Sequence, residues 1–88
     1  MDFFTYNENS KHQFDDFTQT LLAKLVDAYG KVELREIPES GEWCVRIVVT
    51  EGEDQLPLAA LGETSFDAAK RLIRICGLVS DVTLTASF

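Results

Sequence analysis

The spacing of apolar residues changes at Gly30, and this change constrains the fold more than any other feature of the sequence. Before Gly30, apolar residues from Phe14 onward recur at steps of three and four, which is typical of an amphipathic helix. From Lys31 onward, apolar and polar residues alternate, which is typical of half-buried strands. A chain that changes its period in this way is predicted to pack helices against a sheet.

The first helix is predicted to begin after Ser10 and to end at Gly30. Ser10 and Gln13 have the spacing of a capping box, in which the two side chains hydrogen-bond backbone amides of the first turn. Glycine adopts the left-handed conformation that ends many helices. We expect the buried face of this helix to consist of Phe14, Phe17, Leu21, Leu25 and Ala28, flanked by Leu22, Val26 and Tyr29.

Three strands, a second helix and a last strand are predicted to follow. The strands lie near residues 32–34, 43–50 and 56–60, and Pro57 places the third at an edge because proline donates no ladder hydrogen bond. In the second strand, Val45 and its alternate neighbours form one face and Arg46 and its neighbours the other. Thr64 is predicted to cap a helix that ends at Gly77, and residues 82–88 alternate like a further strand.

The predicted fold class is therefore α+β, with the element order α-β-β-β-α-β. Both helices are expected on one face of a small, mainly antiparallel sheet. The 88 residues suit a single domain covering residues 1–88. Within residues 1–9, the aromatic side chains Phe3, Phe4 and Tyr6 fit either an edge strand or a loose tail.

Groups suited to catalysis or metal binding are scarce in this sequence. His12 is the one histidine, and beside Lys11 in a first helical turn it has the setting of a solvated surface residue. Cys44 and Cys76 lack metal-ligand spacing, so we expect reduced thiols in a cytoplasmic protein. No phosphate loop, dinucleotide-binding motif or zinc-protease motif occurs. We predict a protein that is not an enzyme and that uses no metal or cofactor.

The charge is strongly acidic, and the excess is local. The net charge is −7, and between Glu36 and Asp67 eight carboxylates are accompanied by Arg46 as the one cation. Such a surface repels phosphate backbones and anionic lipid, and it favours a basic partner. The alternative is an acidic surface that is merely solvated. The predicted protein-binding residues flank the two turns: Glu39 and Glu42 at one, and Glu51, Glu53 and Asp54 at the other.

The second predicted helix carries a cluster of three cations, Lys70, Arg71 and Arg74. Cations in the later turns of a helix stabilise its negative end, and this role requires no ligand. The alternative role is contact with the phosphates of a nucleic acid. No exposed aromatic residues are interleaved with these cations to stack on bases.

Two families share short features with this chain. The segments WCVRIVV and GETSFDAAKRLIRICGL, with the spacing of Ser65, Ala69, Lys70 and Leu78, resemble a double-stranded RNA-binding domain over residues 14–78. That resemblance implies RNA contact through Lys70, whereas Phe66 and Asp67 stand where the family has two lysines. Separately, the motif GETSFDA is similar to the signature of the HicB-type antitoxin domain, a βββαβ module, over residues 31–88.

The leading functional hypothesis is a small acidic inhibitor that covers a basic, nucleic-acid-binding surface of a larger protein. Antitoxins, nucleic-acid mimics and phage anti-defence proteins, including anti-CRISPR proteins, are similar to this chain in size and charge. An RNA-binding module on the basic helix is the first alternative. A structural or accessory subunit is the second, with the N-terminal aromatic residues and the Pro57 edge as its contact, including a homodimer.

Overall fold

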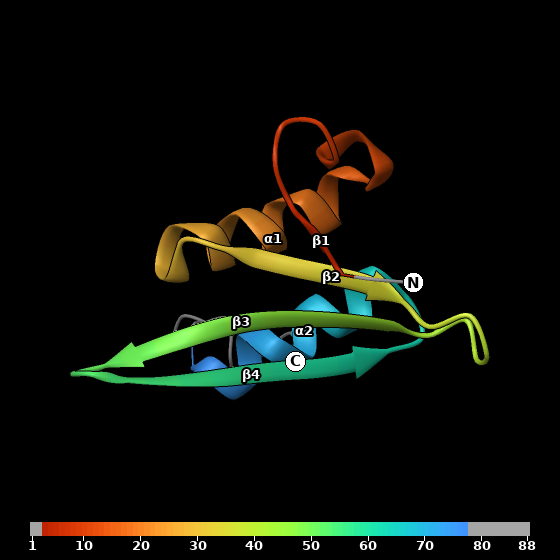
Figure 1. Ribbon diagram of the computed structural model, residues 1–88. Helices are drawn as coiled ribbons and strands as arrows, with labels where there is room; N and C mark the ends of the chain where they lie inside the picture. Colours follow the sequence, from red (N-terminus) through yellow and green to blue (C-terminus); the bar gives the residue numbers. More distant parts are fainter. Residues whose placement is uncertain (1–2, 78–88) are drawn as a thin grey trace.

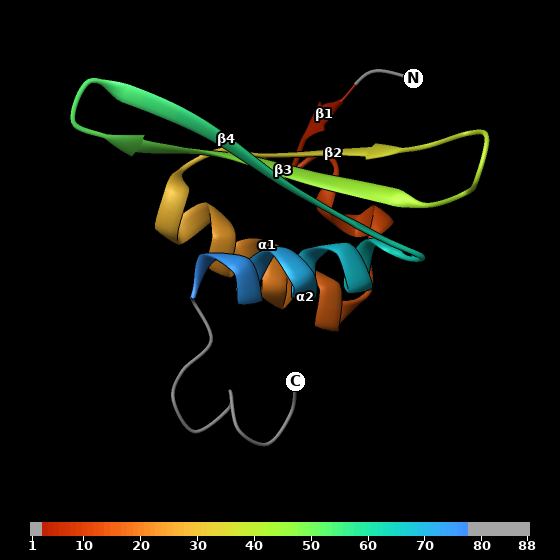
Figure 2. The ribbon, with the colours of Figure 1, turned by 90° about the horizontal axis from the view of Figure 1, so that it is seen from below.

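The two described α-helices lie on the same side of one antiparallel sheet, as Figures 1 and 2 show. The computed structural model describes residues 3–77. The α+β class is confirmed, and the four strands follow each other in the sheet in the order β1-β2-β3-β4. The elements are β1 (Phe4–Thr5), a 3-10 turn (Lys11–Gln13), α1 (Asp16–Tyr29), β2 (Val32–Glu36), β3 (Trp43–Glu51), β4 (Asp54–Gly62) and α2 (Ser65–Cys76).

The predicted element order is wrong at the N-terminus. A short strand precedes the first helix, so the described order is β-α-β-β-β-α rather than α-β-β-β-α-β. β1 pairs antiparallel with β2, with Phe4 opposite Leu34 and Thr5 opposite Glu33. The predicted strand at residues 82–88 lies outside the described residues.

Aromatic packing explains why the N-terminal segment joins the sheet. The Phe4 ring stacks on Phe14 at a centroid distance of 6.3 Å and meets Trp43 edge-on at 6.3 Å. Tyr6 packs on Phe14 at 5.9 Å. These contacts bury apolar area, and stacked and edge-to-face arrangements at such centroid distances are favoured for aromatic pairs. The segment is an edge strand, and two of its three aromatic side chains are used inside the fold.

The start of α1 differs from the capping pattern around Ser10. The Ser10 hydroxyl accepts a hydrogen bond from the amide of Asn7 at 2.9 Å and donates to the carbonyl of Thr5 at 3.1 Å. It therefore holds the N-terminal loop and caps no helix. Asp15 is the cap of α1, and its carboxylate accepts from the amide of Thr18 at 2.9 Å.

The buried face of α1 is also rotated from the predicted one. Leu22 and Leu25 are completely buried, and Thr18 is buried one turn before Leu22. Phe17 is 75% exposed and Ala28 is exposed. The helix packs against both the sheet and α2, so its buried face is set by two neighbours. Periodicity identified the helix, but it did not identify which stripe faces inward.

α2 packs closely against β4 because small residues line the contact. Thr64 caps α2 by accepting a hydrogen bond from the amide of Asp67 at 3.1 Å, as the sequence predicted. Ala68 and Ala69 are completely buried. A side chain at Gly62 would lie 2.8 Å from Cβ of Asp67. The core between the layers contains Phe14, Leu22, Leu25, Val32, Leu34, Val45, Ile47, Ala60, Ala68, Ala69, Leu72 and Ile73.

The sheet has one covered face and one open face. Val45 pairs with Leu34 and Ala60, and all three are buried beneath the helices. Their neighbours along each strand point to the opposite side because successive side chains alternate. No described helix covers that side, as Figure 2 shows. We call it the open face, and it carries Glu33, Arg35, Cys44, Arg46, Val48, Pro57, Ala59 and Leu61.

Candidate functional site

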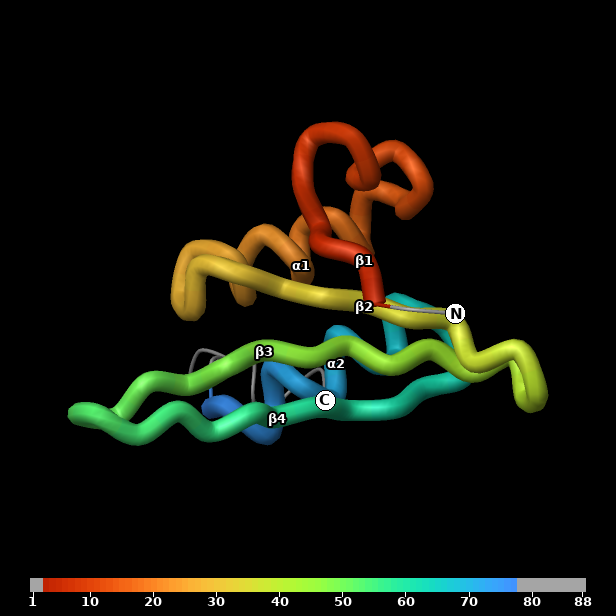
Figure 3. The backbone as a smooth tube through the Cα atoms, in the orientation of Figure 1, coloured from red at the N-terminus to blue at the C-terminus, as the bar shows by residue number. Residues whose placement is uncertain are grey.

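The structure divides the predicted acidic residues into two separate groups. Glu51, Glu53 and Asp54 lie at the β3–β4 hairpin tip, whereas Glu39 and Glu42 lie in the β2–β3 turn. β3 has 9 residues and runs from one group to the other. At roughly 3.3 Å per residue, its two ends are about 26 Å apart. Figure 3 shows the two turns at opposite ends of the sheet, so these five carboxylates do not form one patch.

The hairpin tip presents its carboxylates entirely to solvent. Glu51 pairs with Asp54 across the turn, and Gly52 has the positive φ of 64° that this turn requires. All three acidic side chains of the tip are exposed. Within residues 3–77, none of the three forms an ion pair. Three uncompensated negative charges are therefore concentrated on one projecting turn.

Backbone hydrogen bonds within the β2–β3 turn fix its conformation. The amide of Ile37 donates to the Glu42 carbonyl at 2.7 Å, and the amide of Gly41 donates to the Ile37 carbonyl at 2.7 Å. Glu39 is exposed, while Glu42 is half-buried beside the first residue of β3. This turn is a second acidic end, with fewer fully exposed carboxylates than the hairpin tip.

An apolar strip on the open face connects the two acidic ends. Val48 is 40% exposed and Leu61 is 45% exposed. Val48 lies opposite Pro57, and Cys44 lies opposite Leu61, so side chains of two strands form one surface. We define the apolar strip as Cys44, Val48, Pro57, Ala59 and Leu61. The sequence predicted the alternation of β3 but not that neither described helix covers this partly apolar side.

A charged cluster lies beside the apolar strip. Arg46 donates from Nε and Nη2 to Oε1 of Glu33, at 3.2 and 2.9 Å. The Phe3 ring covers the Arg46 guanidinium at 3.9 Å, which adds a cation–π contact. Lys31 lies 3.9 Å from the other Glu33 oxygen. Arg46 is therefore held in place and its charge is balanced within the chain.

Arg35 differs from Arg46 although both lie on the open face. Its Nε is buried and has no hydrogen-bond partner in the described part of the chain. Its strand neighbour across the sheet is Cys44. Burial raises the pKa of the Cys44 thiol, and the nearby charges of Arg46 and Arg35 oppose that rise. The centre of the open face thus combines a protonated thiol with a guanidinium that has an unused donor.

The three cations of α2 do not act as one group. The Arg71 Nη1 donates to the carbonyl oxygen of Leu61 at 3.2 Å, so this side chain reaches the edge of β4. The Lys70 ammonium lies 5.4 Å from the centre of the Phe66 ring. Arg74 is exposed in the last turn, where it stabilises the negative helix end. The predicted basic face therefore has at least two structural roles.

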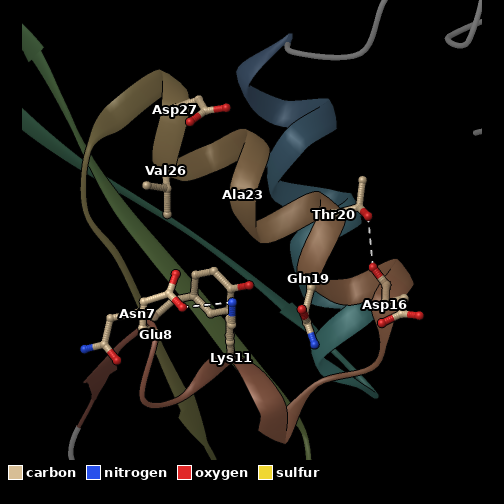
Figure 4. Close-up of a pocket in the computed structure, with 10 residues that line it drawn as sticks. Asn7, Glu8, Lys11, Asp16, Gln19, Thr20, Ala23, Val26 and Asp27 are labelled. Atoms are coloured by element: carbon tan, nitrogen blue, oxygen red, sulfur yellow. Dashed lines mark hydrogen bonds and ion pairs between the residues drawn. The ribbon is translucent and has the colours of Figure 1, made fainter.

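A groove of about 750 Å³ lies between the N-terminal loop and α1, as Figure 4 shows. One wall is formed by Tyr6, Asn7, Glu8 and Lys11, and the other by Asp16, Gln19, Thr20, Ala23, Val26 and Asp27. Sequence reasoning missed this groove because it exists only once the loop folds back over the helix. Its Lys11 ammonium is paired with Glu8 at 2.8 Å.

The groove contains one internal ion pair, between Lys11 and Glu8, and the hydroxyl of Tyr6. The hydrogen bond between Lys11 and Glu8 raises the pKa of Lys11 and lowers the pKa of Glu8, so both stay charged near neutral pH. Burial raises the pKa of the Tyr6 hydroxyl, which disfavours its ionised form. Among the lining residues, no histidine or cysteine is present to act as base or nucleophile.

The described residues contain neither a cluster of metal-ligating side chains nor a helix that could span a membrane. Nowhere in residues 3–77 do three or more histidine, cysteine or acidic side chains group as metal ligands would. Neither α1 nor α2 has the length and apolar character that a membrane crossing requires. Comparison with protein-family models, with curated proteins and with solved structures finds no match to this chain.

Proposed function

We propose that this protein is a nonenzymatic inhibitor that binds a larger protein and covers a basic, nucleic-acid-binding surface on it. The observation that supports this function best is the hairpin tip, where Glu51, Glu53 and Asp54 are exposed and without ion-pair partners in the described chain. The β-hairpin that carries them is a regular two-stranded ladder from Trp43 to Gly62. A stiff, acidic projection of this kind suits contact with a basic protein surface.

Electrostatics determine what such a tip contributes. Complementary charge accelerates encounter between two proteins and disfavours wrong partners, but rim charges add little to affinity by themselves. Most of the binding free energy comes from a few desolvated apolar, aromatic or arginine side chains. An acidic inhibitor therefore needs an apolar contact near its charges. Antitoxins and phage anti-defence proteins such as anti-CRISPR proteins are the functional classes to which this proposal assigns the chain.

The test replaces the three tip carboxylates in the full-length protein with lysine. A second triple variant makes the same change of net charge at exposed carboxylates elsewhere on the fold. The tip variant is Glu51→Lys, Glu53→Lys and Asp54→Lys, and the control is Glu8→Lys, Asp16→Lys and Asp27→Lys on the N-terminal loop and α1.

Tagged wild-type protein first captures its partner from nuclease-treated lysate of its host, and mass spectrometry identifies that partner. The dissociation constant is then measured for all three proteins at low and at moderate salt. We expect the dissociation constant of the tip variant to rise about a hundredfold, because unlike charges at the contact become like charges. For the control we expect a rise of less than about fivefold. Equal affinities of the tip variant and the wild type would contradict the proposal.

An RNA-binding module on α2 is the second candidate. It is favoured by one observation, the exposed positions of Arg71 and Arg74 one turn apart on the helix. Phosphate contacts make binding weaken steeply with salt, so a gel shift of labelled duplex RNA at about 50 mM salt tests it. A shift that disappears in the variant Arg71→Gln, Arg74→Gln would favour this function over inhibition of a protein.

A further inference from the structure

The apolar strip faces away from the helices and is larger than a single exposed side chain. Val48 and Leu61 keep 40% and 45% of their surface exposed, and Pro57 and Ala59 are exposed between them. Strand pairing places Arg46 opposite Ala59, so the strip is bordered by the charged cluster along β2 and β3. Contiguous exposed apolar surface with a polar border is characteristic of protein contact sites.

The two acidic ends determine which kind of molecule can cover this strip. β3 runs beneath the strip from Glu42, just before its first residue, to Glu51 at its end. A second copy of the chain laid on the strip would place acidic turns against acidic turns, whether the strands ran parallel or antiparallel. Like charges in contact oppose association. A partner with cations near both ends of the strip is attracted at both ends.

Arg35, in the middle of the open face, has a hydrogen-bond donor that lacks an acceptor in the described chain. Its Nε is buried without a hydrogen-bond partner among residues 3–77, and an unsatisfied buried donor is costly. Arg46 has no such need because Glu33 accepts two of its hydrogen bonds. Because this atom is enclosed, a carboxylate or a carbonyl oxygen of a partner reaches it only when the half-buried Arg35 side chain turns outward. Arginine is also enriched among the residues that dominate binding energy at interfaces.

We propose that the apolar strip of the open face, with Arg35 beside it, is the anchoring contact for a basic protein. That partner carries an apolar ridge between two groups of cations about 26 Å apart at roughly 3.3 Å per strand residue. It also has a hydrogen-bond acceptor that faces Arg35. This inference rests on the proposed function, and it adds where the partner sits and what pattern its surface carries.

Site-directed photo-crosslinking tests the position of the partner. p-Benzoylphenylalanine replaces Ala59 in one full-length variant and Ala28 in the control, because both alanines are exposed and they lie on opposite sides of the fold. Each variant is irradiated in nuclease-treated host lysate, and adducts are identified by mass spectrometry. We expect one adduct with a basic protein from position 59 and none from position 28.

The other outcomes separate the two proposals. An adduct with a basic protein from position 28 and not from 59 would overturn the open-face contact and leave the inhibitor function intact. An adduct from position 59 with a second copy of the chain would overturn the open-face contact alone, whereas an adduct with a protein that is not basic would overturn both proposals. The absence of an adduct from either position would overturn the open-face contact, while capture of a basic protein by tagged wild type would still support inhibition.

The partner protein identified by crosslinking is then purified, and its affinity for variants of the apolar strip and of Arg35 is measured. The variant Val48→Asp, Leu61→Asp is compared with Phe17→Asp, Ile75→Asp, which changes two exposed apolar residues on the helices. We expect at least about a hundredfold loss for the strip and less than about threefold for the control, since anchors dominate binding. The variant Arg35→Met is expected to lose about tenfold. Circular dichroism and melting curves identify any variant that misfolds, and equal losses in both double variants would contradict the inference.

Discussion

Arg71 of α2 donates a hydrogen bond from Nη1 to the carbonyl oxygen of Leu61 in β4, at 3.2 Å. β4 is the last strand of the described sheet, so its outer side is an edge. In an antiparallel ladder, backbone groups of alternate residues point toward the neighbouring strand or away from it. Leu61 and Pro57 are four residues apart and share one orientation, and Pro57 has no amide to offer. Arg71 and Pro57 therefore occupy two positions at which another strand would pair.

Removal of these two edge features is expected to promote self-association. The variant Arg71→Ala, Pro57→Val restores a free carbonyl and an amide on the outer side of β4, which then resembles an ordinary unprotected edge. We expect multi-angle light scattering to show a mass that increases with concentration. The control Arg74→Ala removes the same charge and does not touch the edge. A double variant whose mass stays identical to that of the wild type at every concentration would contradict this role.

A side chain at Gly62 is expected to destabilise the fold through overpacking. The φ angle of Gly62 is not in the left-handed region, so the restriction comes from space: Cβ would approach the backbone nitrogen of Ala68 and lie 2.8 Å from Cβ of Asp67. We expect Gly62→Ala to lower the free energy of unfolding by about 2–3 kcal/mol, as overpacked sites do. Gly52→Ala, in the open hairpin turn, should cost about 1 kcal/mol because of its positive φ. Urea unfolding measures both, and a smaller loss for Gly62→Ala than for Gly52→Ala would refute the packing explanation.

The cap of α1 is expected to contribute a pH-dependent part of stability. Hydrogen bonding by the Thr18 side chain, and then by its backbone amide, lowers the pKa of Asp15 below its ordinary value of 3.8. A carboxyl whose pKa is lower in the folded state stabilises that state above the unfolded pKa. Its contribution is lost as the pH falls through the folded pKa. The melting temperature, measured from neutral pH to strong acid, should therefore fall less for Asp15→Asn than for the wild type. Parallel curves of melting temperature against pH would contradict this role of Asp15.

The thiol of Cys44 is expected to react slowly near neutral pH. Burial raises its pKa above the ordinary value of 9.0, with Arg46 and Arg35 acting in the opposite direction. In the variant Cys76→Ser, Cys44 is the remaining thiol, and its alkylation by iodoacetamide can be followed against pH. We expect a titration midpoint above that of free cysteine, moved higher still by Arg46→Met. Alkylation at the rate of free cysteine would show that the thiolate is not disfavoured.

Local features of the fold were predictable from the sequence because each depends on residues close together in the chain. The cap at Thr64, the end of α2 at Gly77 and the alternation along β3 all agree with the structure. The edge position of β4 follows from Pro57, because proline cannot take part in a central ladder. These signals act within one helical turn or along one strand.

Features that depend on distant segments were not predictable in the same way. The Ser10 hydroxyl fits a capping box in the sequence, but in the fold it bonds to Asn7 and Thr5. Phe17 fits the periodicity of α1, but it is exposed because α1 packs against both α2 and the sheet. Local patterns identify what a residue can do, whereas packing determines which of those options is used.

The candidate site shows the same division between sequence and tertiary structure. The acidic excess and the identity of its carboxylates were determined by the sequence alone, because net charge does not depend on the fold. Tertiary structure alone decided that the carboxylates separate to the two ends of β3 and that neither described helix covers the apolar strip between them. It also decided that Arg71 donates a hydrogen bond to the Leu61 carbonyl oxygen. The physical reason is that burial and contact are properties of pairs of segments. The two described helices cover one face of the sheet, and which side chains remain exposed on the other face follows from that packing.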